Sequence, residues 1–164
     1  HIGPRVYVRP QTVIRADEVD REGKVHPVII EEESYIQDGV IIHARAGTMV
    51  KIGTSANIAH GVIIHGPCEV GAGCFIALRA AIYSSTLEDE VWVGIGAIIT
   101  RSTIPSHTMI PAGALIRSSS DISQFRLTNI KEQEYKKSVF EASAALRDGY
   151  IELYRKGLPE KADK

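Results

Sequence analysis

The sequence predicts an all-β fold, a parallel β-helix of hexapeptide repeats, with one C-terminal α-helix packed on it. Two patterns predict this fold. From Ile2 to Ile116 a branched aliphatic residue recurs about every six positions, and from about Ile130 to Lys156 apolar residues recur every three or four positions. A six-residue repeat is the signature of a parallel β-helix, whereas spacings of three and four are typical of an amphipathic helix.

The repeat sets the direction of each side chain. Each hexapeptide is one short strand and a turn, and three of them make a triangular coil of about 18 residues. Because strand side chains alternate faces, the aliphatic residue points inward and its neighbours point outward. Cys68 and Cys74 occupy the small inward position of the repeat, so we expect core residues and not ligands. The aliphatic positions are Ile2, Val8, Ile14, Ile30, Ile36, Ile42, Ile52, Ile58, Ile64, Val70, Ile76, Ile82, Leu87, Val93, Ile99, Ile104, Ile110 and Ile116.

The chain divides into four parts. We expect a β-helix over residues 1–117, a polar linker over 118–129, a helix over 130–157 and a tail over 158–164. Gly157 and Pro159 provide the helix stop signal. Insertions interrupt the repeat within Asp17–Ile29 and between Ile42 and Ile52. Loops on a rigid scaffold commonly carry function.

Composition narrows the class of protein. Aromatic residues make up 6% of the chain, so aliphatic side chains must fill the core. The formal net charge of -1 argues against nucleic-acid or membrane-surface partners, and no run is apolar enough to span a bilayer. Two cysteines make no disulfide framework in a chain of this length, so we expect a cytoplasmic protein; no signal peptide is visible, and the start at His1 is compatible with a trimmed product.

Three histidines stand out within the repeat. His43 and His65 each follow the third aliphatic residue of a coil, so they face outward on one column, one coil apart. Adjacent strands lie about 4.8 Å apart, which lets two imidazoles converge on a metal with bonds of about 2.0–2.1 Å. His60 falls at a turn on a different corner. Three-fold symmetry would bring His60 of one chain beside the pair of its neighbour, which predicts a metal site shared between subunits.

Further polar residues surround this column. Glu18 occupies a position of the repeat that normally carries a small, inward-pointing residue, so we interpret it as a candidate catalytic carboxylate. The alternative is that the chain has already left the coil at this point and that Glu18 is solvated. Gln37 faces outward, either to hold a water or substrate oxygen or as an ordinary exposed glutamine. Arg15 lies on the histidine column and can pair with Asp17 within a chain or across subunits.

Four segments resemble gamma-class carbonic anhydrases: IRADE (14–18), YIQDGVIIHA (35–44), NIAHGVIIHGP (57–67) and TIPSHTMIPAGALI (103–116). The resemblance implies a left-handed β-helix homotrimer with one Zn²⁺ (or Fe²⁺ or Co²⁺) at each interface, reversibly hydrating CO2 to bicarbonate. It implies that the ligands are His43, His60 and His65, that Glu18 and Gln37 are catalytic, and that Arg15 and Asp17 pair at the trimer interface.

One segment departs from the family pattern. Members with a long acidic loop after the first histidine ligand use a glutamate there to shuttle protons. The corresponding segment here, Arg45–Lys51 (RAGTMVK), has no acid, whereas the longer loop after Glu18 contains Asp20, Glu22 and His26. Either that loop supplies a substitute shuttle or turnover is slow.

Two other functions fit the same fold. Many hexapeptide β-helix trimers are acyltransferases that bind acyl-coenzyme A at the subunit groove and use one histidine as base. A scaffold subunit with weak or no catalysis would also retain the trimer. The fold alone does not decide among these functions.

Overall fold

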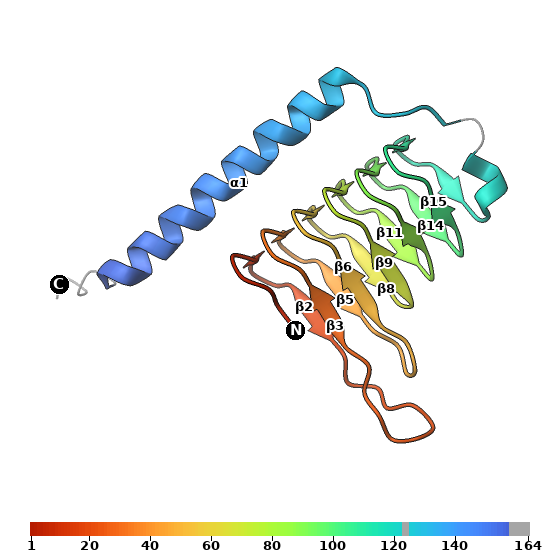
Figure 1. Cartoon of the computed structure of the whole chain (residues 1–164), viewed down its shortest axis with the longest axis horizontal. Coiled ribbons are helices and arrows are strands. Elements are labelled where there is room, and N and C mark those ends of the chain that lie inside the picture. Colours follow the sequence, from red (N-terminus) through yellow and green to blue (C-terminus); the bar gives the residue numbers. More distant parts are fainter. Residues whose placement is uncertain (123–124, 158–164) are drawn as a thin grey trace. The chain divides into compact units, whose positions relative to one another are not determined.

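The computed structural model describes residues 1–122 and 125–157, which form two compact units, a left-handed parallel β-helix ending by Thr128 and a helical unit that begins at Asn129 (Figure 1). The predicted tail over 158–164 and the helix stop at Pro159 lie outside the described residues. The predicted fold class is confirmed.

Three parallel sheets form the sides of the β-helix, and each strand pairs with the strand three places further along the chain. The first sheet contains β1 (Tyr7–Val8), β4 (Tyr35–Ile36), β7 (Asn57–Ile58), β10 (Phe75–Ile76), β13 (Trp92–Val93) and β16 (Met109–Ile110). The second contains β2 (Val13–Arg15), β5 (Ile41–His43), β8 (Ile63–His65), β11 (Ala81–Tyr83), β14 (Ile98–Thr100) and β17 (Leu115–Ile116). The third contains β3 (Val28–Ile30), β6 (Val50–Ile52), β9 (Cys68–Val70), β12 (Thr86–Leu87) and β15 (Thr103–Ile104).

Stacked aliphatic side chains form the core of the β-helix. Ile30, Ile36 and Ile42, one from each sheet of the same coil, have no exposed surface. Cys68 and Cys74 are buried, which confirms that they fill the core. The stacking positions of successive coils are in register, so an inward side chain of an inner coil lies between the one above and the one below.

The first coil is less buried than the repeat alone suggests. Ile2 and Val8 occupy inward positions but remain 53% and 37% exposed. Their register partners Ile30 and Ile36 belong to the second coil. A neighbouring coil therefore covers these two side chains on one side only.

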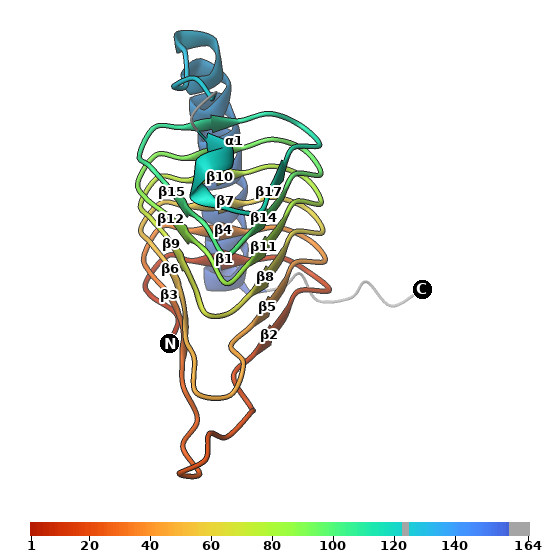
Figure 2. The same cartoon turned by 90° about the vertical axis from the view of Figure 1, so that its right-hand side faces the viewer.

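Two loops leave the same corner of the β-helix, between the second and third sheets (Figure 2). The first loop, residues 16–27, joins β2 to β3, and the second loop, residues 44–49, joins β5 to β6. The next connection, from β8 to β9, takes only Gly66 and Pro67. Both insertions seen in the sequence therefore lie next to the ends of the strands that contain Arg15 and His43.

The segment over 118–129 has some structure of its own. Ser119–Ile122 form a short 3₁₀ helix, η1, and Leu127 pairs with Thr108 in an antiparallel bridge. The described part of this segment therefore contains a short helix and one bridge, and its role as a linker stays a prediction; Ser123 and Gln124 lie outside the described residues.

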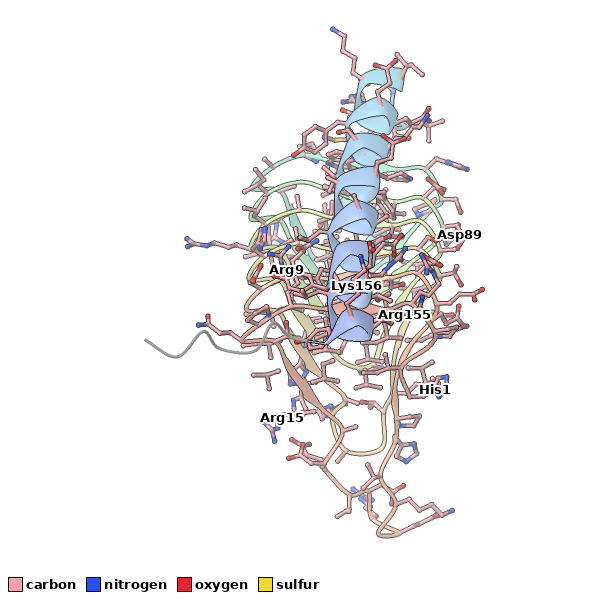
Figure 3. The ribbon with its side chains drawn as sticks, turned by 90° about the vertical axis from the view of Figure 1, so that its left-hand side faces the viewer. His1, Arg9, Arg15, Asp89, Arg155 and Lys156 are labelled. Carbon is pink, nitrogen blue, oxygen red and sulfur yellow. The ribbon has the colours of Figure 1, made fainter. Side chains whose placement is uncertain are left out.

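The C-terminal helix α1 spans Ile130–Lys156. Asn129 begins it with a capping box, because its side chain accepts from the backbone N–H of Lys131 and Glu132 while the Glu132 side chain accepts from the N–H of Asn129. The basic residues Arg155 and Lys156 lie in the last turn, as labelled in Figure 3, where they interact favourably with the helix dipole. Packing of α1 on the β-helix stays a prediction. In residues 1–122 and 125–157, no helix is long and apolar enough to cross a bilayer.

Loss of the N-cap should loosen the start of α1. We expect Asn129→Ala to cost about 1 kcal/mol, because two backbone N–H groups lose their acceptor. Amide hydrogen exchange in the first turn of α1 measures this cost. Asn129→Asp, which keeps an acceptor oxygen, should retain protection, and equal exchange in both variants would contradict the assignment.

Candidate metal centre

A column of polar side chains runs up the edge of the second sheet that faces the two loops. Register pairs Arg15 with His43, His43 with His65, and His65 with Tyr83 in successive coils. The Nδ1 atom of His43 lies 3.2 Å from Nε2 of His65. The two rings are nearly perpendicular, with centroids 4.9 Å apart. The stacking of both histidines predicted from the repeat is confirmed.

Glu18 lies beside this pair, outside the coil. Its Oε1 atom is 3.2 Å from His43 Nε2, and its Oε2 accepts a hydrogen bond of 3.0 Å from the backbone N–H of Ala46. The expectation that Glu18 points into the coil is wrong, because the chain has already left the coil for the first loop. The alternative, a carboxylate that contacts only solvent, is also incomplete. The backbone of Ala46 in the second loop donates to one oxygen of Glu18, and the other oxygen faces His43.

The histidine pair has the nitrogen chemistry of a metal site. His43 Nε2 is buried, and among the described residues it has no partner in hydrogen-bond geometry despite its closeness to Glu18. His65 Nδ1 lies 3.3 Å from the carbonyl oxygen of Gly66. A neutral imidazole that donates through Nδ1 presents the lone pair of Nε2, which is how protein histidines bind zinc. The residues present therefore fit a divalent metal.

His60 lies at the other end of the second sheet, in the turn between β7 and β8. Its Nδ1 is 3.0 Å from Oδ2 of Asp38, and Arg9 Nε lies 3.1 Å from the same carboxylate oxygen. Asp38 is a site residue that the sequence analysis missed. The signal was present, because Asp38 and His60 both follow a stacked isoleucine by two positions in successive coils. A carboxylate on Nδ1 orients His60 and leaves its Nε2 for a ligand.

The two corners are separated by the width of one sheet. His60 and His65 are five residues apart, which spans at most about 17 Å of extended chain. Figure 3 labels Arg9 and Arg15, which mark the two corners, because Arg9 contacts Asp38 and Arg15 pairs with His43. Across residues 1–122 and 125–157 of one chain, no three His, Cys, Asp or Glu side chains are grouped to hold a metal.

Gln37 belongs to the corner of His60 and not to that of Glu18. It directly precedes Asp38, its backbone N–H donates to Ile58, and its backbone carbonyl accepts from the hydroxyl of Thr12. Its side chain is buried, with 6% exposure for the residue, so the interpretation as an exposed glutamine is wrong. The structure does not bring Gln37 together with Glu18 inside one chain.

Arg15 and Asp17 form an ion pair within the chain. Arg15 Nη2 lies 3.0 Å from Asp17 Oδ2, and both side chains are about half exposed. The hydrogen bond with Asp17 raises the pKa of the Arg15 guanidinium, and the same bond lowers the pKa of the Asp17 carboxyl. Their role at a subunit interface stays a prediction.

Comparison with known proteins gives clear relatives. No protein-family model matches the chain. The chain is 31% identical over 161 residues to the Carboxysome assembly protein CcmM of Nostoc sp., an alignment that covers 92% of this chain and 28% of that protein. It is 29% identical over 139 residues to a Carbonic anhydrase of Methanosarcina thermophila, covering 73% of this chain and 54% of that enzyme. The chain thus spans well under two thirds of either relative.

A solved structure shows the same fold. The crystal structure of a hexapeptide transferase family protein from Anaplasma phagocytophilum aligns with a TM-score of 0.59 at 23% identity, covering 91% of this chain and 80% of that one. At this identity the likeness concerns the fold and not the activity. The chain is thus a homologue of gamma-class carbonic anhydrases, with the left-handed β-helix of hexapeptide-repeat proteins.

Proposed function

We propose that this chain reversibly hydrates CO2 to bicarbonate at a metal site shared between subunits of a homotrimer. The observation that carries the proposal is the stacked pair of His43 and His65 with the Glu18 carboxylate 3.2 Å from His43 Nε2. A buried imidazole nitrogen without a hydrogen-bond partner is costly unless a ligand completes it. Sequence similarity to a carbonic anhydrase over 73% of the chain adds support.

The ligands would be His43 and His65 from one subunit and His60 from the next. Three neutral imidazoles suit Zn²⁺, with Fe²⁺ or Co²⁺ as alternatives, and leave one position open for water. The bound metal would supply Lewis acidity that makes water a nucleophile near neutral pH. Asp38 and the Gly66 carbonyl would orient His60 and His65 through their Nδ1 atoms.

Glu18 would handle protons beside the metal ligands. The N–H of Ala46 holds its Oε2, so its Oε1 is directed toward His43 and is available to accept a hydrogen bond from the attacking water. The buried Gln37, next to Asp38, would reach the same site from the neighbouring subunit and orient water or substrate oxygen.

The outer face of the second sheet supports a trimer. A row of exposed aliphatic side chains crosses it between the two corners, with exposures of 41–52%: Val13, Ile41, Ile63, Ile98 and Leu115. An exposed apolar row of this kind on a flat sheet is typical of an interface. A three-fold arrangement that buries this face would also bring the His60 corner of one chain to the His43 and His65 corner of the next.

The test is metal content together with CO2 hydration. Protein prepared anaerobically with zinc or iron should bind about one metal per chain and hydrate CO2. Glu18→Gln should keep the metal and lower kcat by about 10²–10⁴-fold, because the carboxylate that accepts protons is lost. Glu69→Gln, an exposed carboxylate on the third sheet, is the matched control and should leave kcat unchanged. Full activity of Glu18→Gln would contradict the assigned role.

A scaffold function is the second candidate. The alignment that covers 92% of this chain is to a carboxysome assembly protein, of which it spans 28%. Metal bound in full without any hydration would favour a scaffold role. No metal together with binding of acetyl-coenzyme A would favour a transferase.

A further inference from the structure

The first loop is a small antiparallel hairpin. Val19 and Val25 form its bridge, and the N–H of Asp20 donates to the carbonyl of Lys24 at 2.8 Å. Continuing this register by one residue places His26 opposite Glu18. Residues opposite one another in an antiparallel pair have Cβ atoms about 4.5–5.5 Å apart, and residues two apart share a face. Glu18, Asp20 and His26 therefore lie on one face of the hairpin.

The Asp20 carboxylate is held firmly and in turn holds His26. Its Oδ1 accepts backbone hydrogen bonds from Glu22 at 2.8 Å and Lys24 at 2.9 Å. Its Oδ2 lies 2.8 Å from Nε2 of His26. The bond to His26, followed by the backbone N–H of Lys24, lowers the pKa of the Asp20 carboxyl, so Asp20 is an anion at neutral pH.

This pairing determines the chemical state of the imidazole. An anionic carboxylate only accepts hydrogen bonds, so neutral His26 must carry its proton on Nε2 and present a lone pair on Nδ1. Within the described residues, Nδ1 makes no hydrogen bond. The His26 side chain is 36% exposed and that of Asp20 is 19% exposed, so the imidazole is open to solvent while its carboxylate partner is more enclosed.

The second loop lies beside the hairpin. A Cβ at Gly47 would lie 3.8 Å from Cβ of Asp20, so the second loop lies alongside the first, as Figure 2 also shows. The charged groups of the hairpin that contains His26 are Glu18 and Asp20 on its own face, and Arg21 and the exposed Glu22–Lys24 ion pair at the turn. The second loop itself has no acidic side chain.

We propose that His26, positioned by Asp20, is the proton relay between the Glu18 side of the site and bulk solvent. The inference rests on the proposed CO2 hydration. Each CO2 that takes up water gives one bicarbonate and one proton. Nδ1 of His26 accepts that proton, directly or through one water, and the imidazolium then gives it to a buffer base. No other bond forms or breaks, and His26 returns to its neutral state.

Kinetics on the metal-loaded protein test the relay. His26→Gln should lower kcat at low buffer concentration by at least about tenfold while leaving kcat/KM unchanged, because only the proton-release step is affected. Free imidazole added as buffer should restore the rate. Asp20→Asn should give a smaller loss. Glu22→Gln in the same loop and His107→Asn outside it are the matched controls and should behave like the wild type.

A second readout does not depend on activity. Nitrogen-15 NMR of the metal-free wild type should show the His26 proton on Nε2, and Asp20→Asn should lose that preference. A proton on Nδ1 in the wild type would overturn the relay. The oxygen-18 exchange between CO2 and bicarbonate separates the two proposals, since it does not require proton release to buffer. Absence of exchange in the wild type overturns the proposed function and the relay with it, whereas normal exchange with unchanged kcat in His26→Gln overturns the relay alone.

Discussion

His60→Ala and His65→Ala chains should each bind no metal when prepared alone, and should regain metal when unfolded, mixed in equal amounts and refolded together. The expected recovery is about a quarter of the wild-type content, since each interface draws its two chains at random and only one of four combinations supplies all three histidines. The measurement is metal content per chain after removal of loose ions. Loss of one imidazole leaves only two protein ligands, too few for a stable zinc site.

The same experiment contains its own control. His43 and His65 belong to one corner of one chain, paired in register with their rings 4.9 Å apart. A mixture of His43→Ala and His65→Ala chains therefore cannot assemble an intact pair at any interface and should stay free of metal. Recovery in this second mixture, or none in the first, would refute the division of ligands between corners.

The repeat explains why the placement of the three histidines at two corners of the β-helix could be predicted from the sequence. Once the six-residue period is known, the position of His43 and His65 relative to Ile42 and Ile64 sets both their face and their stacking. The same arithmetic puts His60 at another corner. Prediction succeeded here because a coil has little freedom, each inward side chain being fixed by those above and below it.

The loops could not be predicted in this way. The contact of Glu18 with His43 depends on the chain leaving the coil after Arg15 and on the N–H of Ala46, which lies in a different loop. The pairing of Asp20 with His26 depends on a hairpin register that no repeat specifies. Gln37 was misjudged for a related reason, since an outward position in the repeat does not reveal what else packs on that face.

The second large expected effect is a loss of stability when a side chain of the stacked core is shortened. Two adjacent isoleucines of β3 allow this loss to be measured. Ile30 points inward, has no exposed surface and lies between Ile2 and Ile52 of the neighbouring coils, whereas Ile29 faces outward and is half-buried. We expect Ile30→Ala to lower the free energy of unfolding by about 2–5 kcal/mol, because it removes buried methyl groups and leaves a cavity that the rigid coils cannot close.

Ile29→Ala is the matched control, and it should cost less than about 1.5 kcal/mol, because solvent fills the space that the side chain vacates. Urea denaturation at fixed protein concentration measures both variants, since any assembly makes the midpoint depend on concentration. The third sheet is suited to this comparison because the exposed aliphatic row proposed as an interface lies on the second sheet. Equal losses at the two positions would mean that burial in the stack does not dominate stability. In a solenoid a defect is felt by its nearest neighbours, so hydrogen exchange in the Ile30 variant should rise mainly in the first three coils.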